Sequence, residues 1–272
     1  MYFIRDASEQ GANLAVLPEY HLTSWVPNHP EFIATSRKSI EFLSRYQALA
    51  QELNVSIVPG TFCCVHDDYE TAVPDHPAQR MYNVAYFITG GTGEIRSSYQ
   101  KRNLWHPERP FLIPGTQPHQ AFDIPHIFGE EYSLRGGLLI CWDLAFPEAT
   151  RQLIADGAKL IIVPSFWHLS DIDHAGWSLN AGSEKVFLNS VMAARAFENT
   201  CAIVLCNSGG FSQVSMPVLG GYGKLEPGEE AMSVVDVDFD ILEIAENNYK
   251  VREDMERRNW KYTTESDLSN QC

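Results

Sequence analysis

Short apolar runs alternate along this chain with segments of helical periodicity, and this alternation is the feature that most restricts its fold. Apolar runs bounded by Gly, Pro or polar residues predict strands at residues 13–18, 55–65, 82–89, 93–101, 119–124, 133–140, 159–164, 201–205 and 232–239. Apolar side chains at three- and four-residue steps predict helices at residues 31–53, 148–156 and 183–199. Strands interleaved with helices indicate an α/β protein of layered sheets and helices. The hairpin signal at Gly90-Gly91 predicts that these sheets are mixed.

The composition limits the partners that this chain can bind. Its 272 residues are 44% hydrophobic and carry a net charge of -15. Nucleic acids and anionic membrane surfaces need a basic face, so neither is an expected partner. No apolar stretch reaches the roughly 18–20 residues that a membrane helix needs. The six cysteines, in a chain that starts without a recognisable secretion signal, predict reduced thiols and a cytoplasmic location.

The chain contains no internal repeat, low-complexity tract or linker-like stretch. This predicts one compact domain at residues 1–246, followed by a polar tail at residues 247–272.

Three reactive side chains lie where predicted strands end. Glu19 follows the strand at 13–18, Lys101 ends the second strand of the hairpin, and Cys141 follows the strand at 133–140. Ligands of layered α/β proteins collect at the carboxyl ends of strands. A thiol nucleophile needs a base and an oxyanion-stabilising group, which a carboxylate and a lysine can supply. The three residues therefore predict a nucleophilic active site.

The segment after the strand at 133–140 supports Cys141 as the reactive thiol. A tight turn between this strand and the following helix would lift the thiol above the sheet edge and aim backbone N–H groups at the space before it. The default base, histidine, has no recognisable cysteine-protease context at any of His106, His119, His126 and His168. Structural roles are predicted for Cys63, Cys64, Cys201 and Cys206. A metal site at Cys63-Cys64-Val65-His66 fits no standard zinc spacing.

Three motifs resemble the nitrilase, or carbon-nitrogen hydrolase, superfamily. They are LPEYHLT around Glu19, YQKRNLWHPE around Lys101 and LLICWDLAFPEATR around Cys141, and they occur in that family's order. The segments GAKLIIVPSFW and RAFENTCAIVLCN extend the similarity, which runs from about residue 11 to about residue 240.

The resemblance implies a fold and a set of residue roles. The fold would be an α-β-β-α sandwich, assembled into homodimers or larger homo-oligomers. Cys141 matches the nucleophile, Glu19 the general base, and Lys101 the cation that faces the tetrahedral intermediate. Glu108 matches a second glutamate that positions substrate, and the backbone N–H of Trp142 would be a further oxyanion donor. The resemblance implies no metal and no organic cofactor.

The implied reaction is hydrolysis of a non-peptide C–N bond in a small amide. A Cys141 thioester would form, and ammonia or an amine and a carboxylic acid would be released. Four residues near the motifs are predicted to bind substrate or stabilise the oxyanion, namely Tyr20, Trp142, Trp167 and His168. The expected partner is a small amide, a ureido compound or a nitrile.

Two features keep other functions open. The CWDxxFPE pattern with Asp143 resembles the amidase and carbamoylase branches, whereas true nitrilases tend to carry Glu at that position. A nitrilase that converts a nitrile to acid and ammonia, and an N-carbamoyl amidohydrolase, remain alternatives.

Family members usually begin with a strand and a full helix, but only ten residues precede Gly11, so the N-terminal strand is expected to be missing. This motivates an alternative of another class, an inactive binding or assembly subunit.

Overall fold

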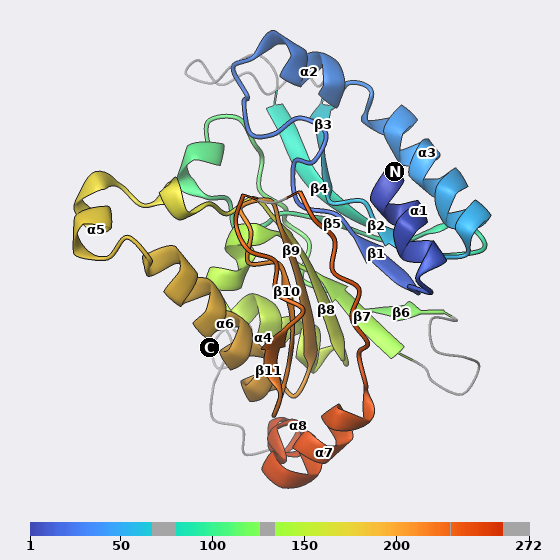
Figure 1. Ribbon diagram of the computed structural model, residues 1–272, viewed down its shortest axis with the longest axis vertical. Helices are drawn as coiled ribbons and strands as arrows, with labels where there is room; N and C mark the ends of the chain where they lie inside the picture. The colour runs from blue at the N-terminus through green and yellow to red at the C-terminus, as the bar shows by residue number, and fades with distance from the viewer. Residues whose placement is uncertain (67–79, 126–133, 229, 258–272) are drawn as a thin grey trace, which may run out of the picture.

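Two β-sheets lie between layers of helices in the computed structural model, which describes residues 1–66, 80–125, 134–228 and 230–257 (Figure 1). The first sheet has five strands, in the order β1-β2-β4-β3, and its fifth strand, β5, also pairs with β4. These strands are β1 (Leu14–Val16), β2 (Ser56–Val58), β3 (Thr61–His66), β4 (Arg80–Ile88) and β5 (Ile95–Gln100). Strands β1 and β2 are parallel, and the other pairs are antiparallel.

The second sheet has six strands in the order β11-β10-β9-β8-β7-β6. They are β6 (Phe122–Ile124), β7 (Leu134–Leu138), β8 (Leu160–Ser165), β9 (Ala202–Asn207), β10 (Gln213–Met216) and β11 (Gly220–Tyr222). Its three central strands, β7, β8 and β9, are parallel, and the outer pairs are antiparallel. Every residue of β8 is buried, as expected for a central strand covered on both faces.

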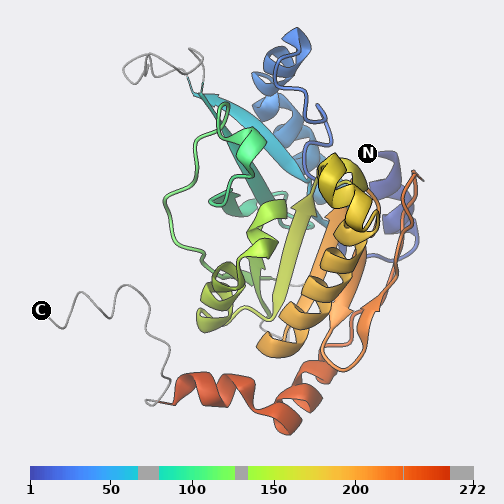
Figure 2. The ribbon, with the colours of Figure 1, turned by 90° about the vertical axis from the view of Figure 1, so that its left-hand side faces the viewer.

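The helices cover the outer faces of the sheets, which gives four layers (Figure 2). Helices α1 (Tyr2–Glu9) and α3 (Ser39–Leu53) pack on the first sheet through a cluster that includes Ile4, Leu49 and Ile57. Helices α4 (Pro147–Ala155) and α6 (Ser183–Asn199) pack on the second sheet, and the same core joins both sheets. The predicted α-β-β-α fold class is therefore confirmed. The other helices are α2 (Pro30–Ser36), α5 (His174–Leu179), α7 (Asp240–Tyr249) and α8 (Val251–Glu256).

Two predicted elements are divided in the structure. The helix predicted at residues 31–53 is two helices, because the chain leaves the helix after α2 and begins α3 at Ser39. The strand predicted at residues 55–65 is two strands, β2 and β3. Gly60, at φ +62°, forms the turn between them, and a β-carbon there would overlap the carbonyl oxygen of Pro18.

The strand prediction at residues 232–239 is wrong. The segment is extended, since Val235, Val237 and Phe239 pack against the core while the residues between them are exposed. It forms no ladder with any strand of the described chain. The alternating pattern identified an extended conformation, but a strand also needs a hydrogen-bonding neighbour.

The two ends of the described chain are helical. Helix α1 leads through Gly11 into β1, which pairs with β2 alone and lies at one edge of its sheet. Near the other end, the Arg252 guanidinium in α8 donates to the carbonyls of Ala158 and Thr200 at 2.7 and 3.2 Å. Helix α7 crosses residue 246, and the division of the chain at that residue stays a prediction. None of the helices within the described ranges is long and apolar enough to cross a membrane.

Candidate active site

The carboxyl ends of β1, β5 and β7 bring together the reactive residues predicted from the sequence. Lys101 Nζ lies 2.9 Å from Glu19 Oε1 and 2.7 Å from Glu108 Oε1. All three side chains are almost fully buried, at 1–2% exposure. The Cys141 thiol is also buried, and the charges of Glu19 and Lys101 both influence its pKa. The structure therefore places the four predicted residues in one cluster.

Fixed donors hold both carboxylates of the cluster. Glu108 ends a 3₁₀ turn at His106–Glu108, and its Oε2 accepts from the backbone N–H of Trp105 at 2.8 Å. The Tyr20 hydroxyl donates to the other oxygen of Glu108. Asn83 Nδ2 donates to Glu19 Oε1 at 2.7 Å and to the Tyr20 hydroxyl at 2.9 Å. Because each oxygen has a partner, the two carboxylates keep defined positions beside Lys101.

Glu19 has the electrostatics of a general base. Its Oε2 accepts from the backbone N–H of Phe166, the first residue after β8, at 2.9 Å. Burial raises the pKa of Glu19 to about 7, against the opposing influence of the Lys101 charge. A base is most useful when its pKa lies near the working pH, so this carboxylate suits proton transfer close to neutrality.

Lys101 and Cys141 keep their protons in this environment. Burial alone would lower the pKa of Lys101, but the charges of Glu19 and Glu108 outweigh it and raise that pKa. Burial, and then the Glu19 charge, raise the pKa of the Cys141 thiol well above its usual value. The resting cluster thus contains an ammonium and a neutral thiol, and the thiol becomes a nucleophile when a carboxylate accepts its proton.

Cys141 lies at a tight turn that resembles a nucleophile elbow. The extended residue Ile140 precedes it, Cys141 itself has φ +45°, and a 3₁₀ turn follows at Cys141–Ala145. Positive φ is uncommon outside glycine and is found at functional turns. The N–H of Trp142 lies in the first turn, where a helix has no internal acceptor. This N–H is therefore available to an oxyanion in front of the thiol.

Asp143 holds the turn in place. Its buried carboxylate accepts from the backbone N–H of Ile140 at 2.9 Å and from the Tyr99 hydroxyl at 2.8 Å. The other oxygen accepts from the backbone N–H and the side-chain amide of Asn103, at 3.0 and 2.8 Å. These bonds connect the cysteine turn to the loop after Lys101, so Asp143 acts as a positioning residue.

Replacing Asp143 with asparagine should loosen this turn. Each carboxylate oxygen of Asp143 accepts from a backbone N–H. The amide NH₂ of an asparagine would replace one of these oxygens, so it would face a backbone N–H that is itself a donor. Leaving buried donors unpaired costs about 1–3 kcal/mol, which urea unfolding would measure. We expect kcat to fall while the pH midpoint of activity stays unchanged, because the substitution leaves Glu19 in place. A variant with wild-type kcat would contradict the positioning role.

The four residues predicted to bind substrate lie in different surroundings. Tyr20 donates to Glu108 and so belongs to the carboxylate network. The rings of Trp142 and Trp167 have centroids 5.2 Å apart, and Trp167 Nε1 donates to Glu184 at 2.6 Å. The ring centroids of His168 and Phe166 are 4.5 Å apart, and His168 Nε2 lies 3.3 Å from the Ser208 hydroxyl. Substrate contacts by these residues stay predictions.

Three residues of the cluster were missed from the sequence. Asn83 interrupts the apolar strand β4, and a polar residue in such a run is a usable signal. Phe166 contributes only its backbone N–H, which no side-chain pattern reveals. Ser165 is fully buried at the end of β8, and its hydroxyl lowers the pKa of the Cys141 thiol, against the larger effect of burial.

Other candidate sites are separate from the cluster. Within the described residues, no group of three or more His, Cys, Asp or Glu side chains could hold a metal ion. The side chain of His66, and all of His126, lie outside what the structure describes. A cavity of about 840 Å³ lies beside β1, and its lining includes none of Glu19, Lys101, Glu108 and Cys141.

Known proteins resemble this chain along most of its length. The sequence profile of the carbon-nitrogen hydrolase family matches residues 1–242. A 2-oxoglutaramate amidase from Paenarthrobacter nicotinovorans is 26% identical over 268 residues, covering 92% of this chain and 80% of the relative. A nitrilase from Pyrococcus abyssi is 30% identical over 165 residues, covering 60% of this chain and 55% of the relative.

Solved structures share the fold. A mutant amidase from Nesterenkonia sp. AN1, whose active-site cysteine has added acrylamide, superposes with a TM-score of 0.64 at 24% identity. The superposition covers 91% of this chain and 89% of the amidase. The family match over most of the chain and the shared four-layer fold agree with each other. The chain belongs to the carbon-nitrogen hydrolase family.

Proposed function

We propose that this protein hydrolyses a small amide through a thioester on Cys141. The observation that carries the proposal is the buried cluster itself. It combines a thiol, a carboxylate whose pKa is raised to about 7 and an ammonium, where strands of both sheets end. These are the nucleophile, base and oxyanion-stabilising cation that acyl transfer needs.

The first half of the reaction forms the thioester. Glu19 accepts the thiol proton as Cys141 Sγ attacks the amide carbon, which becomes a tetrahedral oxyanion. Lys101 and the N–H of Trp142 stabilise the negative charge on its oxygen. Glu19 then returns the proton to the departing nitrogen, so the C–N bond breaks and ammonia or an amine leaves.

The second half of the reaction releases the acid. Glu19 accepts a proton from water, which attacks the thioester carbon, and the proton returns to Cys141 Sγ as the C–S bond breaks. Glu108 does not exchange protons in this scheme. Its carboxylate pairs with Lys101 and accepts from the Tyr20 hydroxyl, which supports a role for Glu108 in positioning Lys101 and the substrate.

A selective trap tests this function. Acrylamide combines an amide with an electrophilic alkene, so it should bind the site and alkylate Cys141. Cys141 is only 7% exposed, whereas Cys64 and Cys206 are half-buried. Among the five cysteines that the structure describes, a reaction governed by accessibility would therefore modify Cys64 and Cys206 first. We expect intact-mass and peptide mapping to find Cys141 as the one modified residue of these five, and turnover to fall in proportion to that adduct.

The matched control for the trap is Glu19→Gln, which removes the base and keeps the shape of the side chain. In this variant we expect the Cys141 adduct to form much more slowly. Turnover that continues after complete modification of Cys141 would refute the proposed function.

The pH dependence of hydrolysis should report Glu19. Because the base must be ionised, kcat/KM should rise with pH up to about 7, the pKa to which burial raises Glu19. Above that pH it should level off until another group titrates. Initial rates over a pH series would measure this. A midpoint near the 4.5 of an ordinary glutamate would show that another group acts as the base.

A substrate panel separates the remaining reactions. The relatives include both an amidase and a nitrilase, so both bond types are tested. We expect ammonia release from small amides to exceed release from the corresponding nitriles and N-carbamoyl compounds. No turnover of any class by the folded protein would favour the binding or assembly subunit instead.

We also propose a homodimer and a cytoplasmic location. Exposed apolar side chains gather on the outer side of α6 and α7, where Val186, Phe197, Ile244 and Tyr249 are 45–58% exposed, and a second copy would cover them. Light scattering coupled to size exclusion would measure the assembly.

The five described cysteines are free, which supports the proposed cytoplasmic location, since a reducing compartment keeps thiols unpaired.

A further inference from the structure

Ser165 is the last residue of β8, and the second sheet places it beside Cys141. Strands β7 and β8 are parallel, with Leu138 opposite Ile162. The same register, continued three residues beyond Leu138, brings Cys141 level with Ser165. Because neighbouring strands lie about 4.8 Å apart, the turn that begins at Cys141 starts next to Ser165.

Hydrogen bonds fix the backbone around Ser165 on two sides. The carbonyl of Ser165 accepts from the backbone N–H of Ser208, in the loop after β9, at 3.1 Å. The next residue, Phe166, donates its backbone N–H to Glu19 Oε2 at 2.9 Å. The end of β8 is therefore held between the loop after β9 and the base of the reactive cluster, and Ser165 keeps a defined position there.

The Ser165 hydroxyl has no acceptor of full geometry in the resting site. The side chain is fully buried, and its Oγ forms no hydrogen bond with any residue that the structure describes. Buried hydroxyls are usually paired, so an unpaired one beside a reactive thiol requires an explanation. A neutral thiol is a weak acceptor, whereas hydrogen bonds to an ionised acceptor are strong. The hydroxyl would therefore gain its acceptor when Cys141 loses its proton.

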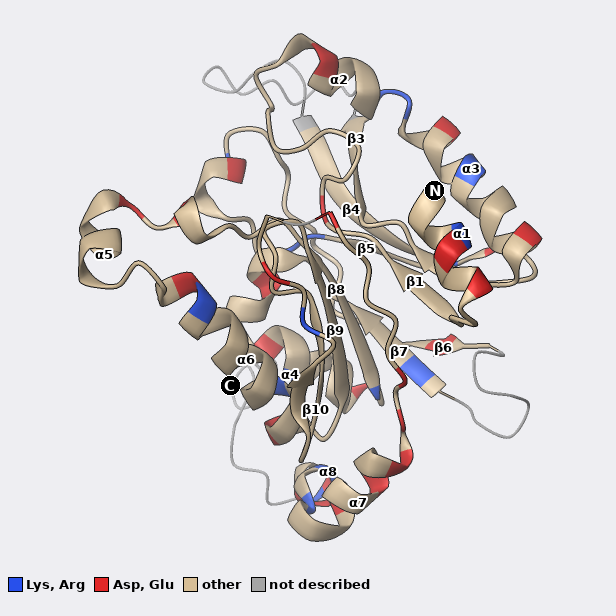
Figure 3. Ribbon diagram, viewed as in Figure 1, with Lys and Arg blue, Asp and Glu red and all other residues tan. Residues whose placement is uncertain are grey.

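The other groups that act on the thiol are already paired. Burial and the charge of Glu19 raise the pKa of the Cys141 thiol, whereas Lys101 and the Ser165 hydroxyl act in the opposite direction. The ammonium of Lys101 is shared between Glu19 and Glu108. Strands β8 and β9 contain no Lys, Arg, Asp or Glu, so they bring no further charge to this end of the sheet (Figure 3). A new negative charge on the sulfur thus depends on nearby dipoles, of which the hydroxyl is one.

We propose that Ser165 is a further catalytic residue, whose hydroxyl donates a hydrogen bond to Cys141 Sγ whenever the sulfur carries negative charge. This assignment rests on the proposed hydrolysis, in which that charge develops twice. Glu19 accepts the thiol proton as the S–C bond forms, and it returns a proton to the sulfur as the C–S bond breaks. The Ser165 hydroxyl keeps its own proton in both halves. Because it bonds the thiolate more strongly than the thiol, it stabilises the charged state selectively.

The rate at which acrylamide alkylates Cys141 tests this role in Ser165→Ala. Loss of a hydrogen bond to a charged acceptor should lower the thiolate fraction by roughly tenfold to hundredfold. A less stabilised thiolate is a better nucleophile, which recovers about half of that factor on a logarithmic scale. We therefore expect alkylation at about pH 7 to be roughly three- to tenfold slower than in wild type. Hydrolysis should show a similar loss in kcat/KM.

Alkylation also separates this proposal from the proposed function. The trap needs a reactive thiol but no hydrolysis of an amide. A protein that is alkylated at Cys141 and cleaves no amide would refute the proposed function, and the comparison with Ser165→Ala would still report whether the hydroxyl acts on the sulfur.

Ser215→Ala is the matched control. Ser215 is also fully buried, and its Oγ likewise has no partner in the described chain, but it lies on β10, which β9 separates from β8. Both substitutions remove an unpaired buried hydroxyl, so neither should lower the free energy of unfolding. Ser215→Ala should be alkylated at Cys141, and should turn over substrate, at the wild-type rate.

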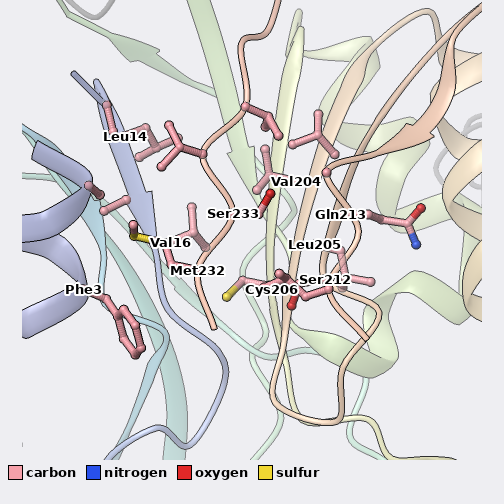
Figure 4. Close-up of a pocket in the computed structure, with 18 of the residues that line it drawn as sticks. Phe3, Leu14, Val16, Val204, Leu205, Cys206, Ser212, Gln213, Met232 and Ser233 are labelled. Carbon is pink, nitrogen blue, oxygen red and sulfur yellow. The ribbon is translucent and has the colours of Figure 1, made fainter. Parts of the chain in front are cut away.

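Cys206 reports whether the substitution disturbs β8 itself. It pairs with Pro164, the residue before Ser165, and it lines the cavity beside β1 (Figure 4). Its reaction with acrylamide should be the same in Ser165→Ala as in wild type. Equal alkylation of Cys141 in Ser165→Ala and Ser215→Ala would overturn the proposal. Slower alkylation of Cys141 that comes with faster reaction of Cys206, or with a lower free energy of unfolding, would assign a structural role and overturn it as well.

Discussion

Replacing Cys141 with alanine is expected to abolish amide hydrolysis and leave the fold intact. Without the sulfur no thioester can form, and the remaining groups can only polarise the substrate. Loss of the nucleophile in a serine hydrolase lowers kcat by roughly 10⁶, and we expect a loss of that order here. The thiol is one buried atom beside the cluster, so the free energy of unfolding should change by about 1 kcal/mol. Ammonia release and urea unfolding measure the two effects.

Cys201→Ala is the matched control for this variant. Cys201 is also fully buried and free, but it precedes β9, at the end of the parallel strands opposite to Cys141. This control loses the same atom from the core and should keep wild-type turnover. Hydrolysis by Cys141→Ala at a rate near that of Cys201→Ala would remove the thioester from the mechanism.

The sequence was sufficient to predict which reactive residues meet. Glu19, Lys101 and Cys141 each follow an apolar run, and such runs become strands because they bury their side chains between layers. Strands in one layered protein end at common edges, so three distant positions become neighbours. The same reasoning predicted the four-layer class, since apolar runs alternate with amphipathic helices. The prediction of the fold class did not depend on the conformation of any loop.

The contacts that complete the site depend on tertiary structure. The backbone N–H of Phe166 reaches Glu19 because β8 lies beside β7 in the second sheet and its end faces β1. No property of the phenylalanine side chain encodes that contact. The segment at residues 232–239 shows the same limit. Its alternation encodes an extended conformation, whereas pairing depends on what lies beside it, and there the structure has the cavity beside β1.

Replacing Lys101 with methionine is expected to reduce both activity and stability. Lys101 is the shared partner of two buried carboxylates, at 2.9 and 2.7 Å. Removing one member of a buried charge cluster typically costs about 3–5 kcal/mol, because the other charges are left without compensation. The oxyanion would also lose a donor, which lowers kcat by about 10²–10³. Steady-state kinetics and denaturant unfolding would measure the two losses.

The instability of Lys101→Met should depend on pH with a defined sign. Without the ammonium, the folded-state pKa of Glu19 rises beyond its value of about 7, while the unfolded value stays near 4.5. The folded variant then binds more protons than the unfolded chain, so its stability falls as pH rises through this window. The deficit relative to wild type should therefore grow between about pH 6 and about pH 9.

The surface pair of Arg5 and Glu52 provides the control for Lys101→Met. These side chains are about half-exposed at 2.6 Å, and exposed ion pairs contribute little to stability. Arg5→Met should therefore unfold like wild type at every pH and keep full activity. Lys101→Arg retains the cation and should recover much of the stability but little of kcat, because the guanidinium places its charge differently. A Lys101→Met variant as stable as Arg5→Met, with a deficit independent of pH, would show that Lys101 does not compensate the two carboxylates.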